Sequence, residues 1–228
     1  KNPDEFRLIG KLVPRVDVPA KTNGSAVFTL DIVLPGMLTA VVAHPPRFGA
    51  TLKAFEPNKA KAIPGVTDVV TISSGVAVVA KDFWSARKGR EALSVTWDES
   101  NAMPEGTLDI FAHYAKLAEK PGVVADGKYE MKGDPETVLA NAKRVFTAEY
   151  RFPYLAHATL EPMNCVVRLN NDGTCEIWNG EQSQSRDERN VSELRGIKPE
   201  QVILHMLYAG GSFGRRVNPY SDYMLETV

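Results

Sequence analysis

The sequence lacks an excess of charge of either sign, a long apolar run and a rich supply of cysteine. Its 228 residues carry 27 basic and 28 acidic side chains, and the net charge of -1 does not indicate a nucleic-acid partner or an anionic membrane surface. No apolar run approaches the ~18–20 residues of a membrane span. Residues 1–6 contain no apolar core, so no signal peptide is expected there. The 43% hydrophobic content can bury one sizeable core or two small ones.

The two cysteines, Cys165 and Cys175, fall in a predicted hairpin with strands near 163–169 and 174–179. For a loop of two to four residues, the residue numbers of two facing positions in this hairpin add up to about 343–345. The two cysteine numbers sum to 340, so these residues should not face each other. We therefore predict two free thiols and infer no redox compartment from them.

The residue pattern before position 99 predicts mostly strands, with two helices. Asp82 can cap a helix over 82–93, and the pair Pro64-Gly65 can end a shorter helix over 55–63. Alternating or β-branched residues predict the strands of this part. These strands are 26–32, 37–43, 66–72, 76–80 and 94–97.

A polar, turn-rich stretch at 99–106 separates this part from the rest. An amphipathic helix is predicted directly after it, over 107–119, with Leu108, Phe111, Ala115 and Ala118 on one face. Capping and turn residues then predict further helices, and β-branched runs predict further strands. The helices are 135–143, 185–195 and one that begins near 221; the strands are 144–151, 163–169, 174–179 and 201–208.

The most informative segment is 210–216 (Gly-Gly-Ser-Phe-Gly-Arg-Arg). A strand that ends in Gly-Gly-x-Phe-Gly lets the backbone approach a ligand and expose its N–H groups. Arg215 and Arg216 can then meet a phosphate. The segment is neither GxGxxG nor a P-loop, because no Gly-Lys-Ser/Thr follows. On spacing alone, a glycine-rich turn with two solvated arginines explains the pattern equally well.

Two other segments carry candidate side chains. His157 and Glu161 lie beside a predicted strand, and neither has a partner at metal-ligand spacing, so a structural role is the better interpretation for each alone. Gln182 lies between a strand and a helix, which is typical of a side chain that faces a ligand. Helix capping with an exposed charged face explains residues 180–189 at least as well.

Together, these segments resemble one family. PGMLTAVVAHPP, IPGVTDVV, YRFPYLAHATLEPMNC, WNGEQSQSRDERNVSELRGI and GGSFGRR follow one another along nearly the whole chain. In this order they are similar to the large, molybdopterin-binding subunit of the molybdenum hydroxylases, the group of xanthine dehydrogenase and aldehyde oxidase. Within the group, the isoquinoline 1-oxidoreductase type is most similar.

The resemblance implies an α+β fold that is part of a longer subunit. An N-terminal lead-in (1–13) would precede an α/β hammerhead domain (14–106). A connecting helix and linker (107–124) would lead to a partial molybdopterin-binding α/β domain (125–228).

The resemblance also implies the cofactor and its residues. A molybdenum ion would be held by the sulfurs of molybdopterin cytosine dinucleotide, which requires no Cys/His cluster in the protein. Phe213 and Gly214 would lie nearest the metal's oxygen ligand, while Gly210 and Gly211 allow close approach. Ser212 and Arg215 of the same turn, and Gln182, complete the predicted cofactor-binding set. Glu181 stands where relatives have threonine.

The implied reaction is hydroxylation of an N-heterocycle or oxidation of an aldehyde, with water as the oxygen source. Implied partners are a small 2Fe-2S subunit and a cytochrome c acceptor, and the implied compartment is the bacterial periplasm ahead of the cytoplasm. Val217 and Leu155 replace residues typical of purine-oxidising relatives, so a purine substrate is not expected. The family's general-base glutamate would lie beyond residue 228, so residues 1–228 alone are expected to be inactive and to bind no cofactor.

Two alternatives stay open from the residues. The chain can be a non-catalytic module for subunit contacts or cofactor packing, or a stand-alone protein that binds a small ligand. If it is part of a larger subunit, an exposed apolar surface is expected where the other domains pack.

Overall fold

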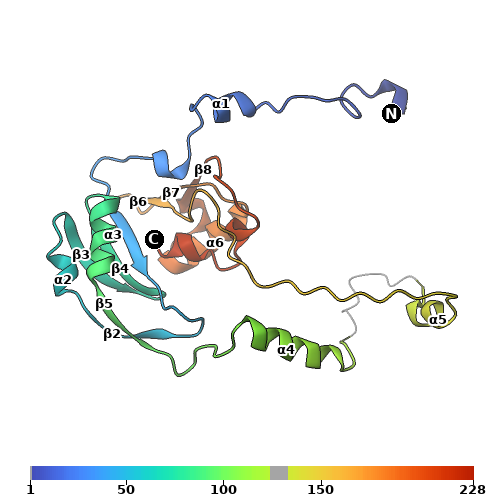
Figure 1. Ribbon diagram of the computed structural model, residues 1–228. Helices are drawn as coiled ribbons and strands as arrows, with labels where there is room; N and C mark the ends of the chain where they lie inside the picture. Colours follow the sequence, from blue (N-terminus) through green and yellow to red (C-terminus); the bar gives the residue numbers. More distant parts are fainter. Residues whose placement is uncertain (1, 124–132) are drawn as a thin grey trace.

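Two regions of paired strands make up the folded part of the chain (Figure 1). The structure is a computed structural model that describes residues 2–123 and 133–228. Helix α4 (Thr107–Ala118) lies between the two regions in sequence. No helix in the described residues is long and apolar enough to cross a membrane. The predicted boundary at 124/125 lies outside the described residues.

The first region contains two small antiparallel sheets. Strand β4 is central in a sheet of order β1-β4-β3, and β2 pairs with β5. Helix α3 packs on β4 very closely, since a Cβ at Gly89 would lie only 2.7 Å from the Val78 side chain. The bounds are β1 Thr39–Ala43, β2 Thr51–Glu56, α2 Asn58–Lys61, β3 Val66–Ile72, β4 Gly75–Ala80, α3 Phe83–Ala92 and β5 Ser94–Asp98.

The second region is a three-stranded sheet covered on one face by helices. Strands β6 and β7 form an antiparallel hairpin, and helix α6 connects β7 to the parallel strand β8. Helix α6 ends at Gly196, whose left-handed φ of 63° suits glycine. The bounds are β6 Val166–Leu169, β7 Cys175–Asn179, α6 Gln184–Arg195, β8 Val202–Met206 and α7 Asp222–Leu225.

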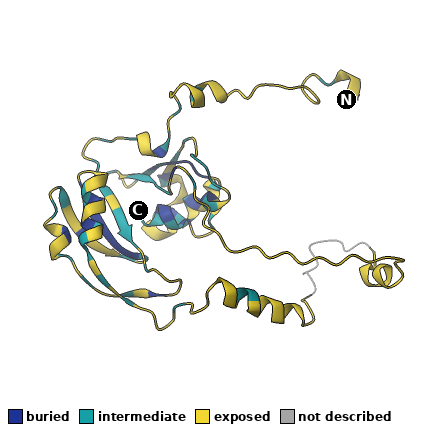
Figure 2. Cartoon of the chain, viewed as in Figure 1, coloured by how far each residue is buried: buried dark blue, intermediate teal, exposed yellow. Residues whose placement is uncertain are grey.

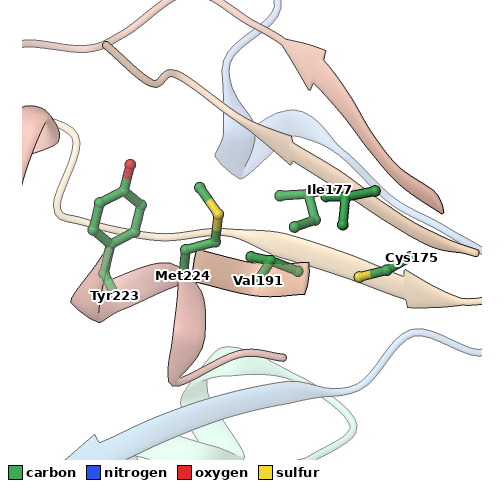
Figure 3. Close-up of a cluster of buried hydrophobic side chains, with 6 residues drawn as sticks. Cys175, Ile177, Val191, Tyr223 and Met224 are labelled. Atoms are coloured by element: carbon green, nitrogen blue, oxygen red, sulfur yellow. The ribbon is translucent and has the colours of Figure 1, made fainter. Parts of the chain in front are cut away.

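Each region has its own core, and burial is concentrated there (Figure 2). In the second region, β7 alternates between buried and half-buried residues, as a strand with one covered face should. Figure 3 shows the resulting cluster between sheet and helices. Its buried members are Cys175, Ile177, Val191, Val202, Tyr223 and Met224.

Short helices occupy several of the remaining segments. They are η1 Pro3–Glu5, α1 Val18–Thr22, η2 Thr29–Asp31, α5 Pro135–Ala140, η3 Pro199–Gln201 and η4 Arg215–Val217.

An ion pair of 2.8 Å between His44 and Glu226 connects the two regions.

Most predicted elements are confirmed to within a few residues. Asp82 caps α3 by accepting a hydrogen bond from the Ser85 amide at 2.9 Å. In the β6–β7 hairpin, Leu169 faces Cys175, so paired numbers sum to 344 as the loop length predicts. Cys165 and Cys175 are both free thiols.

Three predictions of secondary structure are wrong. Residues 26–32 are not a strand, because Asp31 accepts a hydrogen bond from the Phe28 amide and closes the short helix η2. The predicted helix over 55–63 begins late, because residues 51–56 pair with β5 instead. Residues 144–151 are extended but unpaired within the described chain.

Many large apolar side chains are exposed. Helix α4 has the predicted apolar spacing, yet it buries no residue, and Leu108 is 81% exposed. The extended segment that precedes β6 exposes Phe152 and Tyr154 in the same way. Exposed apolar side chains are what the sequence analysis expected where other domains would pack.

Replacing Ile177, which is fully buried in the second core, tests that core. Ile177→Ala should lower the free energy of unfolding by about 2–5 kcal/mol, because it removes buried methyl groups and leaves a cavity. Ile203→Ala on the neighbouring strand is the matched control, since Ile203 is 40% exposed. Denaturant unfolding measures both variants, and equal losses would contradict the assigned core.

Candidate functional site

The glycine-rich segment after β8 forms a sharp turn. Gly211, Phe213 and Gly214 have positive φ angles of 105°, 53° and 92°. Such angles are uncommon for a residue with a side chain, and Phe213 therefore holds a strained backbone position. The Phe213 ring is 76% exposed and lies outside both cores. The predicted bend is present.

The turn leaves consecutive backbone N–H groups without an acceptor. The amides of Arg215 and Val217 donate to carbonyl oxygens inside the turn, at 2.9 and 3.2 Å. Within the described chain, no group accepts a hydrogen bond from the amides of residues 211–214. Consecutive free N–H groups in a turn form a concavity that binds anionic oxygens.

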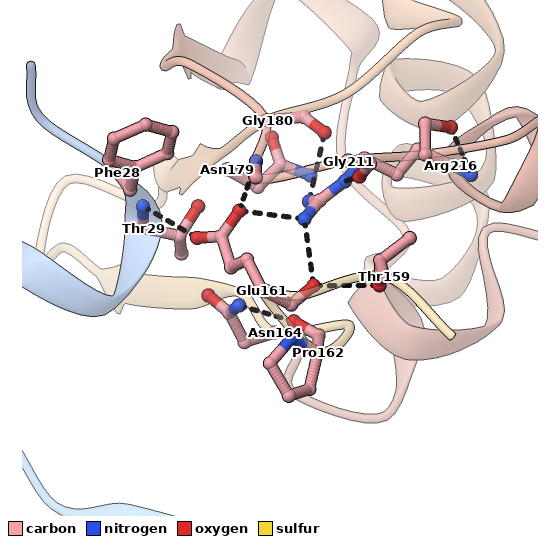
Figure 4. Close-up of polar contacts among 12 residues, drawn as sticks. Phe28, Thr29, Thr159, Glu161, Pro162, Asn164, Asn179, Gly180, Gly211 and Arg216 are labelled. Atoms are coloured by element: carbon pink, nitrogen blue, oxygen red, sulfur yellow. Dashed lines mark hydrogen bonds and ion pairs between the residues drawn. The ribbon is translucent and has the colours of Figure 1, made fainter. Parts of the chain in front are cut away.

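Glu161 fixes the base of this turn through a buried carboxylate (Figure 4). Its Oε1 accepts from the Thr29 amide at 3.1 Å, and its Oε2 accepts from the Gly210 amide at 2.8 Å. The Glu161 amide in turn donates to the Gly210 carbonyl at 3.1 Å. One side chain thus joins η2, the segment before β6 and the glycine turn.

Arg216 is the cationic partner of Glu161, with Nη2 2.7 Å from Oε2. Its Nε donates to the Gly211 carbonyl at 2.8 Å and its Nη1 to the Gly180 carbonyl at 3.0 Å. The side chain is fully buried. The suggestion that Arg216 meets a phosphate, and the alternative of a solvated arginine, are therefore both wrong: the guanidinium is enclosed by protein acceptors.

Arg215 and Gly210 have partners that the sequence did not indicate. The Arg215 guanidinium makes two hydrogen bonds with Asp222, at 2.9 and 2.8 Å, so its charge is balanced within the protein. A Cβ at Gly210 would lie 2.3 Å from the Glu161 Cβ. The missing side chain of Gly210 makes room for Glu161, and its predicted role in the approach of a ligand stays a prediction. The role of Arg215 towards a cofactor stays a prediction.

Gln182 and the glycine turn come together as predicted. Gln182 lies between β7 and α6, and its Oε1 accepts a hydrogen bond from the Ser212 hydroxyl. Both side chains come from loops at the same end of the β7 and β8 strands, which run parallel. His157 and Leu155 are exposed, and Val217 is partly exposed. No three metal-ligating side chains gather anywhere in the described residues.

Glu181, which precedes Gln182, is a buried acid that sequence reasoning missed. It is 2% exposed, and so is Asp187 in the first turn of α6. Burial, reinforced by the Asp187 carboxyl, raises the pKa of Glu181 to about 7. The expectation that the charges of 180–189 form an exposed face is wrong for these two residues. The one sequence signal was the replacement of a family threonine by Glu181.

Comparison with known proteins agrees with this geometry. Residues 117–228 match the family model of the molybdopterin cofactor-binding domain. The chain is 31% identical over 224 residues to the isoquinoline 1-oxidoreductase subunit beta of Brevundimonas diminuta, a match that covers 96% of this chain and 29% of that protein. Residues 117–228 thus belong to the molybdopterin cofactor-binding domain family.

Two further proteins are similar to the chain along nearly its whole length. The membrane-bound aldehyde dehydrogenase (pyrroloquinoline-quinone) of Gluconacetobacter polyoxogenes is 31% identical, over 100% of this chain and 30% of its own length. The structure of quinoline 2-oxidoreductase from Pseudomonas putida 86 has the same fold, with a TM-score of 0.69 at 16% identity over 96% of this chain and 33% of that one. The chain thus spans about 30% of the length of the curated relatives it matches.

Removing the Arg216 charge tests the buried ion pair between Arg216 and Glu161. Arg216→Met should cost about 3–5 kcal/mol of unfolding free energy, because it leaves the Glu161 carboxylate buried without its cation. Arg189→Met on the exposed face of α6 is the control, and its change should stay within about 0.5 kcal/mol. Chemical denaturation compares the two, and a loss at Arg216 as small as the control would show that the ion pair is dispensable.

Proposed function

We propose that this chain forms part of the cofactor-binding surface of a molybdenum-dependent oxidoreductase. The substrate class is an N-heterocycle or an aldehyde, with water as the oxygen source. The observation that carries the proposal is the turn at 211–214, whose free amides lie beside Gln182. Three relatives, which are named after isoquinoline, quinoline and an aldehyde, support this substrate class.

The residues present fit a molybdopterin group. The site is rich in donors, because the amides of 211–214 have no acceptor in the described chain and the Oε1 of Gln182 is already occupied, which leaves Nε2 to donate. Donors suit the oxygens of a metal centre and of a pterin phosphate. When bound, the cofactor supplies two-electron oxidation and transfer of a water-derived oxygen.

The chain's own residues would bind and orient that group. Gly211, Ser212, Phe213 and Gly214 would offer their backbone N–H groups, and Gln182 its side-chain amide. The exposed Phe213 ring would cover the site and limit access of water. Glu161 and Arg216 hold the turn from behind and do not face the group themselves.

Several finer features belong to the same proposal. They are the cytosine dinucleotide form of the cofactor, the partial molybdopterin-binding domain at 125–228, the small 2Fe-2S subunit, a cytochrome c acceptor and a periplasmic compartment. An α/β hammerhead domain over 14–106 is supported by two small sheets with the helices α2 and α3 packed against them in that region. The exposed apolar surface of α4 and of the segment before β6 would receive the other domains of the subunit.

Metal and pterin analysis of the full-length protein tests the cofactor. We expect close to one molybdenum and one pterin for each subunit. The name of the aldehyde dehydrogenase relative includes pyrroloquinoline quinone, so the same preparation should be assayed for a quinone. A quinone without molybdenum would overturn the proposal. A protein free of both would favour a non-catalytic module for subunit contacts.

Substitution of Gln182 tests the site itself. Gln182→Ala should lower kcat/KM by about 100-fold, because it removes one preorganised donor from the site. Gln184→Ala is the matched control, since Gln184 is exposed two residues further along the chain, at the start of α6. Steady-state kinetics with an aldehyde and with isoquinoline measure both variants. Similar rates in the two variants would remove Gln182 from the site.

A further inference from the structure

Glu181 and Asp187 form a buried pair of carboxyl groups whose oxygens lack other donors. Both residues are 2% exposed. Ser221 donates its hydroxyl to Oδ1 of Asp187 at 2.5 Å. In the described chain, no group donates to Oδ2 of Asp187 or to either carboxyl oxygen of Glu181. Each carboxyl group shifts the pKa of the other, so the two side chains are neighbours, and a proton on one of them can satisfy the other.

Among the residues that the structure describes, no buried cation is left to balance two negative charges at this position. The buried guanidinium of the region, Arg216, is already paired with Glu161. Arg186 on α6 acts on Asp187 from an exposed position. The other titratable groups that face the pair are the Cys165 thiol before β6 and the Tyr223 phenol on α7, and burial raises the pKa of both. Two ionised carboxylates here would repel each other in a site that water does not screen.

The pair also lies directly behind the proposed cofactor site. Glu181 is the residue before Gln182, which accepts a hydrogen bond from Ser212 of the glycine turn. Asp187 is tied through Ser221 to the start of α7. A change in the separation of Glu181 and Asp187 therefore moves the backbone that carries Gln182.

We propose that Glu181 and Asp187 share one proton, and that this shared proton positions Gln182 against the glycine turn. Glu181 carries the proton and donates it to Asp187, which remains the charged partner. Glu181 is a positioning residue, because it acts through Gln182. The positioning part rests on the proposed function; the shared proton does not.

The pH dependence follows from the direction of the pKa shift. The pKa of Glu181 is raised from 4.5 to about 7, so the folded protein keeps a proton that the unfolded chain releases. Stability from this group is fully present below about pH 4.5, falls between 4.5 and 7, and is lost above 7. The Glu181–Asp187 pair therefore lowers the stability of the second region as the pH rises towards 7.

Thermal unfolding of the full-length protein between pH 5 and pH 8 tests the shared proton. The native protein should lose several degrees of melting temperature over this range. Glu181→Gln should lose much less, because an amide donates to Asp187 at every pH. Glu193→Gln, at an exposed position of α6, is the control and should follow the native protein. Parallel curves for all three proteins would overturn the inference, and so would a native curve that depends on added Ca²⁺ or Na⁺.

Infrared spectroscopy of the native protein gives a second test that needs no folded variant. With ¹³C-labelled glutamate, a protonated carboxyl band that shifts with the label should be present at pH 6 and absent at pH 8. Absence of that band at pH 6 would overturn the inference.

Pterin retention after dialysis at pH 6 and pH 8 separates the two proposals. Greater loss at pH 8 in the native protein than in Glu181→Gln supports positioning of Gln182, and equal loss overturns it. A protein without pterin at any pH, but with the pH-dependent unfolding, would refute the proposed function and leave the shared proton standing.

Discussion

The buried ion pair between Glu161 and Arg216 determines where the glycine turn lies. Burying two charges costs several kcal/mol for each ion unless their hydrogen bonds are satisfied. Here Arg216 donates to the Gly211 and Gly180 carbonyls as well as to Glu161, and Glu161 accepts from two backbone amides. Both charged groups therefore have their hydrogen bonds satisfied, and moving the turn would leave a buried charge without partners.

This ion pair divides the motif Gly-Gly-Ser-Phe-Gly-Arg-Arg into two functions. Gly210 and Arg216 face inwards, and Gly210 is glycine because the Glu161 side chain occupies the space of its Cβ. Residues 211–214 face outwards with free amides, and Phe213 is exposed. The resemblance assigned residues 210–215 to the cofactor, and these roles stay predictions. The contacts show that Gly210 and Arg216 also hold the turn in place.

The sequence predicted most local structure and did not predict contacts between distant segments. Spacing and caps predicted α3, α4, α6 and the hairpin register, because these depend on residues close together in the chain. The ion pair joins residues 55 apart, and no local pattern distinguishes Arg216 from the neighbouring Arg215. The order of motifs brought Gln182 and Ser212 into one predicted site. The burial of Asp187 was missed because charge alternation is also typical of an exposed helix.

The N-terminal segment shows why chain order is a poor guide to the site. The Thr29 amide donates to Glu161, Phe28 forms a parallel bridge with Tyr208, and Lys21 lies over the Tyr208 ring at 4.8 Å. These residues precede the first sheet in sequence, yet they contact the second region, and Figure 4 shows Phe28 and Thr29 beside Glu161. Two buried acids near this turn differ in their partners: Glu161 has a cation and backbone donors, whereas in the described part of the chain Glu181 has Asp187 alone. A fixed anchor and a titratable support can therefore act on the same loop.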